Sequence, residues 1–274
     1  MNEQQPFSPL GDPPPATGQH SVERQIRRRT FLSFAVFGLA GAGGLGVWKW
    51  FRSLPKNADH LALPTRNALE FNEKVNNLFF SEAHLAPEYP LSEAAPKPRV
   101  NGYAGMNRDF KPEEWMLRVE HPRKETLAIS LGELKALPKT EIVFDLKCIE
   151  GWNQIVHYGG VKFSDFLRHY RLGTRSGGVL PKQPRDWYSY VGLETPDGKY
   201  YVGLDMKSVL HPQTILCYEL NGQALPPGHG APLRLIIPTK YGIKNLKRIG
   251  RMVFSDARPK DYWHQRGYDY DAAL

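Results

Sequence analysis

The sequence predicts an α+β domain that is rich in strands, contains short helices and follows an N-terminal leader. Two observations favour this class. Several short segments alternate apolar and polar residues, and the 274-residue chain has 23 Pro and 25 Gly, which is typical of many turns between strands. No internal repeat or coiled-coil pattern is visible. A helical bundle is therefore disfavoured.

Residues 1–26 are expected to be a disordered N-terminus. Their first part, "MNEQQPFSPLGDPPPATGQH", is rich in Pro and poor in apolar side chains. Such a segment cannot bury enough apolar surface to offset the entropy lost on ordering.

Residues 27–52 join an arginine cluster to an uncharged stretch over residues 31–48. Eighteen residues span roughly 27 Å as a helix, slightly less than the ~30 Å hydrocarbon core of a bilayer. The pair Arg28 and Arg29, followed by Thr-Phe-Leu, resembles the twin-arginine export signal. The alternative is a plain N-terminal membrane anchor. Either interpretation predicts a periplasmic or other extracytoplasmic location for the folded domain, with residues 31–48 as a possible tether in the membrane.

The remaining chain is divided into a Pro-rich linker with the first part of the folded domain, residues 53–105, and the main domain, residues 106–274. A Ser130…Glu133 capping box predicts a short helix, and a second helix is expected over 162–172. The hairpin over 187–204 turns at Pro-Asp-Gly. Further strands are expected at residues 113–120, 140–148, 213–222, 232–238 and 248–255.

The formal net charge of +8 does not indicate nucleic-acid binding. Residues 1–52 contain six Lys/Arg and three Asp/Glu, which accounts for +3, and the rest is spread over 222 residues. Nucleic-acid binding needs a basic stripe or a known module, and neither is present. A few converging basic side chains that bind a phosphate explain the charge more simply.

Two cysteines, Cys148 and Cys217, occur in different settings. Cys217 lies in the apolar strand "TILCYEL" and is interpreted as a core residue. Cys148 ends a strand and is followed by a carboxylate, a glycine and an indole in "DLKCIEGWN". No Cys-x-x-Cys is present, which excludes structural zinc and covalently attached haem. A nucleophile, with a base such as His157, His169 or His229, and a single thiolate ligand to a soft metal or cofactor both stay open.

Two motifs give this question a context. The segment "LPPGHGAPLRLIIPTKYGIKNLKRI", residues 225–249, resembles the molybdopterin-binding segment of the sulfite oxidase superfamily, and "KCIEGW" resembles the segment with its molybdenum-ligating cysteine. The resemblance runs from about Phe71 to the end of the chain. In detail it is closest to the catalytic subunits of bacterial periplasmic methionine sulfoxide reductases. It implies a sulfite-oxidase-type fold and a molybdenum–molybdopterin cofactor.

The resemblance also implies roles for single residues. Cys148 is expected to ligate molybdenum, and Glu150 and Trp152 are expected to line the substrate pocket. The expected cofactor contacts are Asn76, Phe79, Phe80, His84, Thr195, His229, Arg234, Asn245, Leu246 and Lys247. A guanidinium and an ammonium suit a phosphate chemically, and Gly230 and Gly242 allow the backbone to approach a cofactor closely.

The implied activity is a two-electron transfer of an oxygen atom at a sulfur or nitrogen centre, with a small-molecule or protein-bound sulfoxide as substrate. The expected electron partner is a membrane haem protein. Sulfite oxidases have Gly-Asn-Arg after the cysteine where this chain reads "CIEGWN", and His229 replaces an asparagine of the reductases. The chain ends at Leu274 without a dimerisation domain, so a monomeric catalytic unit is expected. The alternatives are a sulfite dehydrogenase and a tethered binding module that has lost the metal.

Overall fold

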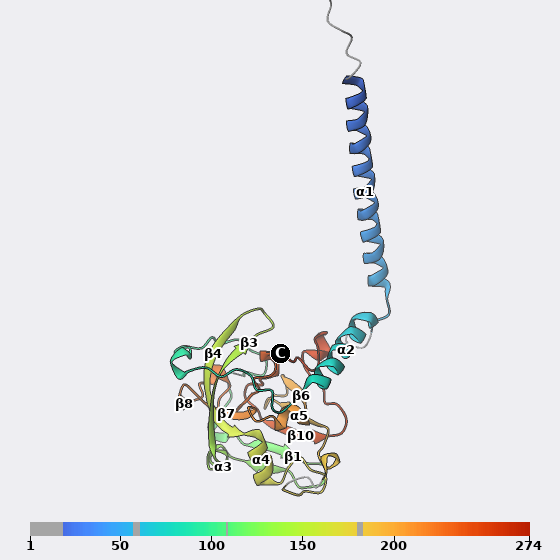
Figure 1. Cartoon of the computed structure of the whole chain (residues 1–274). Coiled ribbons are helices and arrows are strands. Elements are labelled where there is room, and N and C mark those ends of the chain that lie inside the picture. The colour runs from blue at the N-terminus through green and yellow to red at the C-terminus, as the bar shows by residue number, and fades with distance from the viewer. Residues whose placement is uncertain (1–18, 57–60, 108, 180–182) are drawn as a thin grey trace, which may run out of the picture. The chain divides into compact units, whose positions relative to one another are not determined.

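The computed structural model describes residues 19–56, 61–107, 109–179 and 183–274 (Figure 1). The chain divides into two units, Met1–Pro55 and Lys56–Leu274. The first unit contains one long helix, and the second contains both sheets and every other helix. We describe the two units separately.

Helix α1 (Gln19–Ser53) is the described part of the first unit. Residues 19–26, expected to be disordered, form its first turns, because "QHSVERQI" lacks Pro and continues as helix through the arginine cluster into the apolar stretch. Residues 1–18 of the expected disordered segment lie outside the described residues. Large apolar side chains such as Phe34, Phe37 and Trp48 are exposed along the helix. No helix within the described ranges is both long and apolar enough to span a membrane.

The first sheet of the second unit is mixed, with strand order β2-β1-β10-β5-β6. Its strands β1 and β10 run parallel, and its other neighbours are antiparallel. The β5-β6 pair is the hairpin that the Pro-Asp-Gly turn predicts. The bounds are β1 (Leu117–Glu120), β2 (Leu127–Ile129), β5 (Tyr190–Glu194), β6 (Tyr201–Asp205) and β10 (Arg251–Ser255).

The second sheet is antiparallel, with order β3-β4-β7-β8 and with β9 paired to β7. Its longest pairing joins β3 to β4 over nine residue pairs, so these two strands form a hairpin whose turn contains Cys148. The bounds are β3 (Lys139–Lys147), β4 (Asn153–Lys162), β7 (Ile215–Leu220), β8 (Gln223–Ala224) and β9 (Arg234–Ile236).

Short helices connect the strands of the second unit. Helix α3 begins with the expected capping box, because the Ser130 hydroxyl accepts from the Glu133 N–H and the Glu133 carboxylate accepts from the Ser130 N–H. The α-helices are α2 (Leu63–Phe79), α3 (Leu131–Lys135), α4 (Phe163–Tyr170) and α5 (Met206–Leu210). The 3-10 helices are Leu91–Glu93, Pro112–Glu114, Pro184–Asp186, Pro227–His229, Gly242–Lys244 and His264–Arg266.

The main hydrophobic core lies between the sheets. It contains Leu117 of β1, Val191 of β5 and Leu216 of β7, all with no exposed surface. A second cluster around Phe144 and Tyr158 lies on the other side of β4 and β7. This two-sheet arrangement with short helices confirms the predicted α+β class.

Strand β4 is the main element that we did not predict. Gly159 and Gly160 interrupt its alternation, and the register with β7 shifts between them. A Cβ on Gly160 would lie 2.2 Å from the Leu216 carbonyl oxygen. Gly160 therefore allows β4 to approach β7 closely, and the same residue interrupts the alternating pattern by which a strand is recognised in the sequence.

Candidate functional site

Cys148 lies in the tight turn between β3 and β4. Its N–H donates to the Trp152 carbonyl (2.9 Å), and its own carbonyl accepts from the Gly151 N–H (3.1 Å). Gly151 adopts a φ of 85°, which favours glycine. The turn holds the half-buried thiol against a cavity of about 260 Å³. Cys217 is instead fully buried in the core, and burial raises the pKa of its thiol to about 12.

This cavity brings together segments that are far apart in the sequence. The β3-β4 turn meets the loop at residues 99–104, the 3-10 turn at Pro227–His229, strand β9 and the loop that follows it. Seven of the predicted site residues line it, namely Cys148, Glu150, Trp152, His229, Arg234, Asn245 and Lys247. We call it the cysteine cavity.

Arg234 is a buried cation in the wall of the cysteine cavity, with 3% of its surface exposed. Its Nη1 donates to the Tyr158 hydroxyl and the His229 carbonyl, both at 3.1 Å, and its Nη2 donates to the Asn245 carbonyl at 3.3 Å. Its Nε is buried and has no hydrogen-bond partner. All of its acceptors are neutral, so its charge is not compensated by them.

Lys247 is a second cation without an acidic partner. Its Nζ donates to the carbonyls of Asn101 and Gly228, the latter at 2.9 Å. Burial, and then repulsion from Arg234, lowers the pKa of Lys247 to about 7. Within the part of the chain that the structure describes, no carboxylate forms an ion pair with Arg234 or Lys247. A buried guanidinium beside a partly buried ammonium, neither with a carboxylate partner among the described residues, favours a bound anion.

His229 and Asn245 complete this side of the cavity as neutral groups. Burial, reinforced by Arg234 and Lys247, lowers the pKa of His229 to about 4, so its imidazole is neutral at pH 7. The Asn245 amide is fixed because its Oδ1 accepts from the Ile237 N–H at 2.8 Å and its Nδ2 donates to the Tyr241 carbonyl at 3.3 Å.

The opposite side of the cavity is a polar cluster around Glu150. The Glu150 Oε2 atom accepts from the Trp152 indole N–H (3.0 Å) and from the Asn101 amide (3.2 Å). The Arg99 guanidinium lies 4.7 Å from the centre of the Trp152 ring, at cation–π distance. Asn101 also reaches the Cys148 sulfur, with 3.8 Å between Nδ2 and Sγ. The thiol is thus in contact with an amide donor.

Comparison with known proteins identifies the domain that carries this cavity. Residues 104–263 match the family model described as the oxidoreductase molybdopterin-binding domain. The chain belongs to this family. The molybdopterin-binding domain is therefore that of a molybdenum-dependent oxidoreductase with a molybdenum–molybdopterin cofactor.

Relatives that cover most of the chain belong to the same class of enzyme. A putative protein-methionine-sulfoxide reductase subunit, YedZ1 of Azospira oryzae, is 35% identical over 202 residues, which cover 73% of this chain and 72% of the relative. The protein-methionine-sulfoxide reductase catalytic subunit MsrP of Ralstonia nicotianae is 30% identical over 271 residues, covering 93% and 76%. These matches confirm the family resemblance predicted from the motifs. The crystal structure of the sulfane dehydrogenase SoxCD from Paracoccus pantotrophus aligns with a TM-score of 0.45 and 20% identity, over 55% of this chain and 40% of that one.

The cysteine cavity fits the cofactor of this domain in its chemistry. Molybdopterin carries a phosphate, and Arg234 presents an unpartnered Nε while Lys247 has only carbonyl acceptors. Phosphate and guanidinium form strong charge-assisted hydrogen bonds. The Cys148 thiol, which lines the same cavity, is of the soft ligand type that suits molybdenum.

The predicted contacts in the N-terminal part of the domain lie at a different cavity. Asn76, Phe79, Phe80 and His84 line a space of about 320 Å³ together with Lys147, the residue before Cys148. Phe79 is 78% exposed. The structure therefore does not bring these four residues to the wall of the cysteine cavity.

Thr195 and Leu246, two further predicted contacts, have structural partners. The Thr195 hydroxyl donates to Asp197 (2.6 Å) and accepts from the Tyr200 N–H (3.2 Å), which stabilises the β5-β6 turn. The Leu246 side chain is fully buried in the main core. Its carbonyl accepts from the Leu235 N–H, which ties the cationic loop to β9.

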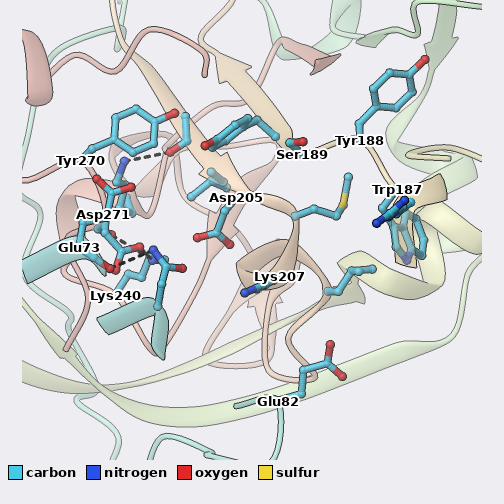
Figure 2. A pocket seen from close by; sticks show the side chains of 18 of the residues that line it. Glu73, Glu82, Trp187, Tyr188, Ser189, Asp205, Lys207, Lys240, Tyr270 and Asp271 are labelled. Atoms are coloured by element: carbon cyan, nitrogen blue, oxygen red, sulfur yellow. Dashed lines mark hydrogen bonds and ion pairs between the residues drawn. The ribbon is translucent and has the colours of Figure 1, made fainter. Parts of the chain in front are cut away.

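A larger cavity, of about 970 Å³, lies between α2, α5 and the β5-β6 hairpin. Figure 2 shows Glu73, Lys240, Tyr270 and Asp271 on one side of it and Trp187 and Tyr188 on the other. Its buried lysines are paired, because Lys240 contacts Asp271, and Lys244 contacts Asp261 at 2.6 Å. We call it the paired-lysine cavity.

Sequence reasoning missed Arg99, Asn101 and Tyr158 as residues of the cysteine cavity. Arg99 and Asn101 belong to an irregular loop about fifty residues before Cys148, and Tyr158 lies on the strand that was not predicted. Only the basic and amide side chains next to a Pro-rich connector could have suggested the first two. Of the histidines considered as a base for Cys148, His229 alone lines the cavity in the described chain.

Proposed function

We propose that this molybdenum oxidoreductase reduces a sulfoxide, either a small molecule or a sulfoxide on a protein, and that Cys148 is the thiolate ligand of its metal. The observation that carries the proposal is that Cys148 lines the same cavity as Arg234 and Lys247, for which the described residues provide no carboxylate partner. The names of the relatives YedZ1 and MsrP support a methionine sulfoxide as the substrate.

In this proposal, some residues of the cysteine cavity bind the cofactor and others shape the substrate pocket. Arg234 and Lys247 would bind the cofactor phosphate, and neutral His229 and Asn245 would offer hydrogen bonds to the pterin without adding charge. The remaining predicted contacts, Asn76, Phe79, Phe80, His84, Thr195 and Leu246, would act after a rearrangement or through their backbone. Glu150 and Trp152 would shape the substrate pocket next to Cys148.

The overall reaction converts a sulfoxide, two protons and two electrons into a sulfide and water. The cofactor, when bound, would supply the two-electron redox chemistry of this oxygen-atom transfer. Electrons would come from a membrane haem protein, because the sequence contains no Cys-x-x-Cys-His attachment site for haem. We propose that the catalytic unit is monomeric.

The decisive experiment measures molybdenum content and activity of the purified protein. We expect about one molybdenum per chain and consumption of reduced viologen dye on addition of methionine sulfoxide. Full-length protein without molybdenum would favour a binding module that has lost the metal. Activity that is independent of molybdenum and lost on alkylation would favour a thiol enzyme with Cys148 as nucleophile.

A sulfite dehydrogenase is the second candidate, and one observation favours it. The sequence lacks an arginine after Cys148, yet the structure places Arg99 on the wall of the same cavity. A guanidinium there could bind an anionic substrate. Reduction of ferricyanide by sulfite, compared with oxidation of viologen by methionine sulfoxide, distinguishes the two. Arg99→Gln should abolish the first activity and spare the second.

We also propose that the protein is exported in folded form through the twin-arginine pathway and acts in the periplasm, tethered by residues 31–48 or released from them. The side chains of Arg28 and Arg29 lie outside those that the structure describes. Replacing both by Lys should leave cofactor-loaded protein in the cytoplasm, whereas Arg24→Lys with Arg27→Lys, the matched control, should not. Export of the Arg28/Arg29 variant through the unfolded-chain route would contradict the proposal.

A further inference from the structure

The contact between Asn101 and Cys148 is not used by the phosphate binding that we propose for Arg234 and Lys247. Asn101 lies in the loop at residues 99–104, outside the residue range that matches the family model, and its side-chain nitrogen lies 3.8 Å from the Cys148 sulfur. An amide N–H is a donor, and a thiolate sulfur is an acceptor. The geometry is that of an N–H···S hydrogen bond.

Two further contacts fix the Asn101 amide in this position. The same Nδ2 lies 3.2 Å from Glu150 Oε2, so its two hydrogens can serve the carboxylate and the sulfur separately. Glu150 is in turn held by the Trp152 indole N–H at 3.0 Å, and the Arg99 guanidinium covers that indole. The amide therefore belongs to a network with Glu150 and Trp152.

The backbone of Asn101 is anchored from the other side of the cavity. Its carbonyl accepts a hydrogen bond from Lys247 Nζ, which also donates to the Gly228 carbonyl. One residue thus links the two cavity walls: its carbonyl contacts a phosphate-binding candidate, and its amide contacts the candidate metal ligand. Such a bridging residue can orient a ligand without touching the substrate.

We propose that Asn101 is a positioning residue that donates a hydrogen bond to the Cys148 sulfur and raises the reduction potential of the metal that this sulfur binds. The inference rests on the proposed role of Cys148 as a ligand. An N–H dipole aimed at the sulfur withdraws electron density from the metal and stabilises its electron-rich, reduced form. Glu150 acts through Asn101, because it fixes the orientation of the amide.

The test uses the molybdenum-loaded full-length protein. Asn101→Ala and Asn101→Leu both remove the donor but leave different volumes, so a shift that they share identifies the lost hydrogen bond and not a packing change. Asn101→Gln keeps the amide and should recover part of the wild-type value. Asn153→Leu is the matched control, because this asparagine is five residues from Cys148 but donates to Asp145.

The measurement is the midpoint potential of molybdenum from a redox titration followed by electron paramagnetic resonance, with metal content determined for each variant. We expect the Ala and Leu variants to have a lower potential and an altered spectrum, and Asn153→Leu to match the wild type. An unchanged potential and spectrum in both Asn101 variants would overturn the inference. If Asn101→Leu loses its metal and Asn101→Ala does not, the potential and spectrum of Asn101→Ala alone test the inference.

Cys148→Ser separates this inference from the function on which it rests. If its molybdenum spectrum equals that of the wild type, Cys148 is not a ligand and the proposed function fails as well. If its spectrum changes while those of both Asn101 variants do not, only the role of Asn101 is wrong.

Discussion

The cysteine cavity and the paired-lysine cavity differ in how their charges are balanced. In the paired-lysine cavity, Lys240 and Lys244 contact Asp271 and Asp261, whereas in the cysteine cavity Arg234 and Lys247 contact only neutral oxygens. The paired-lysine cavity has nearly four times the volume, at about 970 Å³ against 260 Å³. Uncompensated charge, and not volume, is the reason why we propose the cysteine cavity as the cofactor site, because a fold can satisfy its own ion pairs without a ligand.

The largest effect is expected at the thiol of the cysteine cavity. Cys148→Ser replaces a soft, electron-donating thiolate by a hard and poorly ionised hydroxyl, so oxygen-atom transfer should become negligible while the protein folds and retains pterin. Turnover and the molybdenum spectrum are the measurements. Cys217→Ser is the matched control, since its thiol lies in the core, and should cause only a modest loss of stability. Native turnover in Cys148→Ser would show that the Cys148 thiol has only a packing role and does not bind the metal.

Substitutions in the paired-lysine cavity should change the stability of the fold but not the binding of the cofactor. Lys240→Met leaves the Asp271 carboxylate buried without its partner and should lower the free energy of unfolding by about 3–5 kcal/mol. Chemical denaturation measures this change. The double variant Lys240→Met/Asp271→Leu should recover most of the loss. If Lys240→Met instead releases the cofactor without destabilising the fold, the distinction between the two cavities is wrong.

Arg234 should show the reverse pattern. Arg234→Met removes a charge-assisted hydrogen bond to a phosphate, worth roughly 1.5–3 kcal/mol, so cofactor affinity should fall by about ten- to 150-fold. Molybdenum and pterin content after gel filtration measure retention. The Lys240→Met variant serves as the control, with full retention in its folded fraction. Full pterin occupancy and unchanged thermal stability in Arg234→Met would show that the phosphate is bound elsewhere.

The smallest effect concerns the protonation of Lys247. Its folded-state pKa of about 7 lies below the ordinary value of 10.5, so the unfolded chain binds more protons between these values. The destabilisation caused by this lysine is complete below pH 7 and is relieved as pH rises toward 10.5. An anion needs the protonated form. Sulfate should therefore bind the cofactor-free protein about tenfold more tightly at pH 6 than at pH 8.5, a difference of ~1.4 kcal/mol.

Calorimetric titration with sulfate at the two pH values checks this prediction. Lys247→Met should remove most of the pH dependence while Arg234 still gives weak binding. Sulfate affinity that rises with pH would contradict the assignment of Lys247 as the titrating cation.

Local signals predicted most of the fold. The Ser130…Glu133 capping box and the Pro-Asp-Gly turn specify α3 and the β5-β6 hairpin from neighbouring residues alone. Strand β4 could not be read in the same way, because Gly160 is required by the approach of Leu216, which is 56 residues away. A non-local contact of this kind is visible in the sequence only as a break in the alternation of apolar and polar residues.

The sequence predicted which residues line the candidate site, but it did not predict which of their charges form ion pairs. The motifs around Cys148 and Arg234 identified seven lining residues. No pattern in the sequence reveals that Arg234 and Lys247 lack carboxylates while Lys240 and Lys244 have them, since all four lie within fourteen residues of one another. The ion pairs of Lys240 and Lys244 depend on Asp271 and Asp261, which follow β10 in the sequence.

Gly230 connects the two loops that carry the cationic wall. It adopts a φ of 104°, its carbonyl accepts from the Arg248 N–H at 3.2 Å, and a Cβ at this position would lie 2.8 Å from the Cβ of Lys247. Any side chain at position 230 would therefore have to push the Lys247 loop away from the Arg234 loop, so the spacing of the two cations depends on this single glycine.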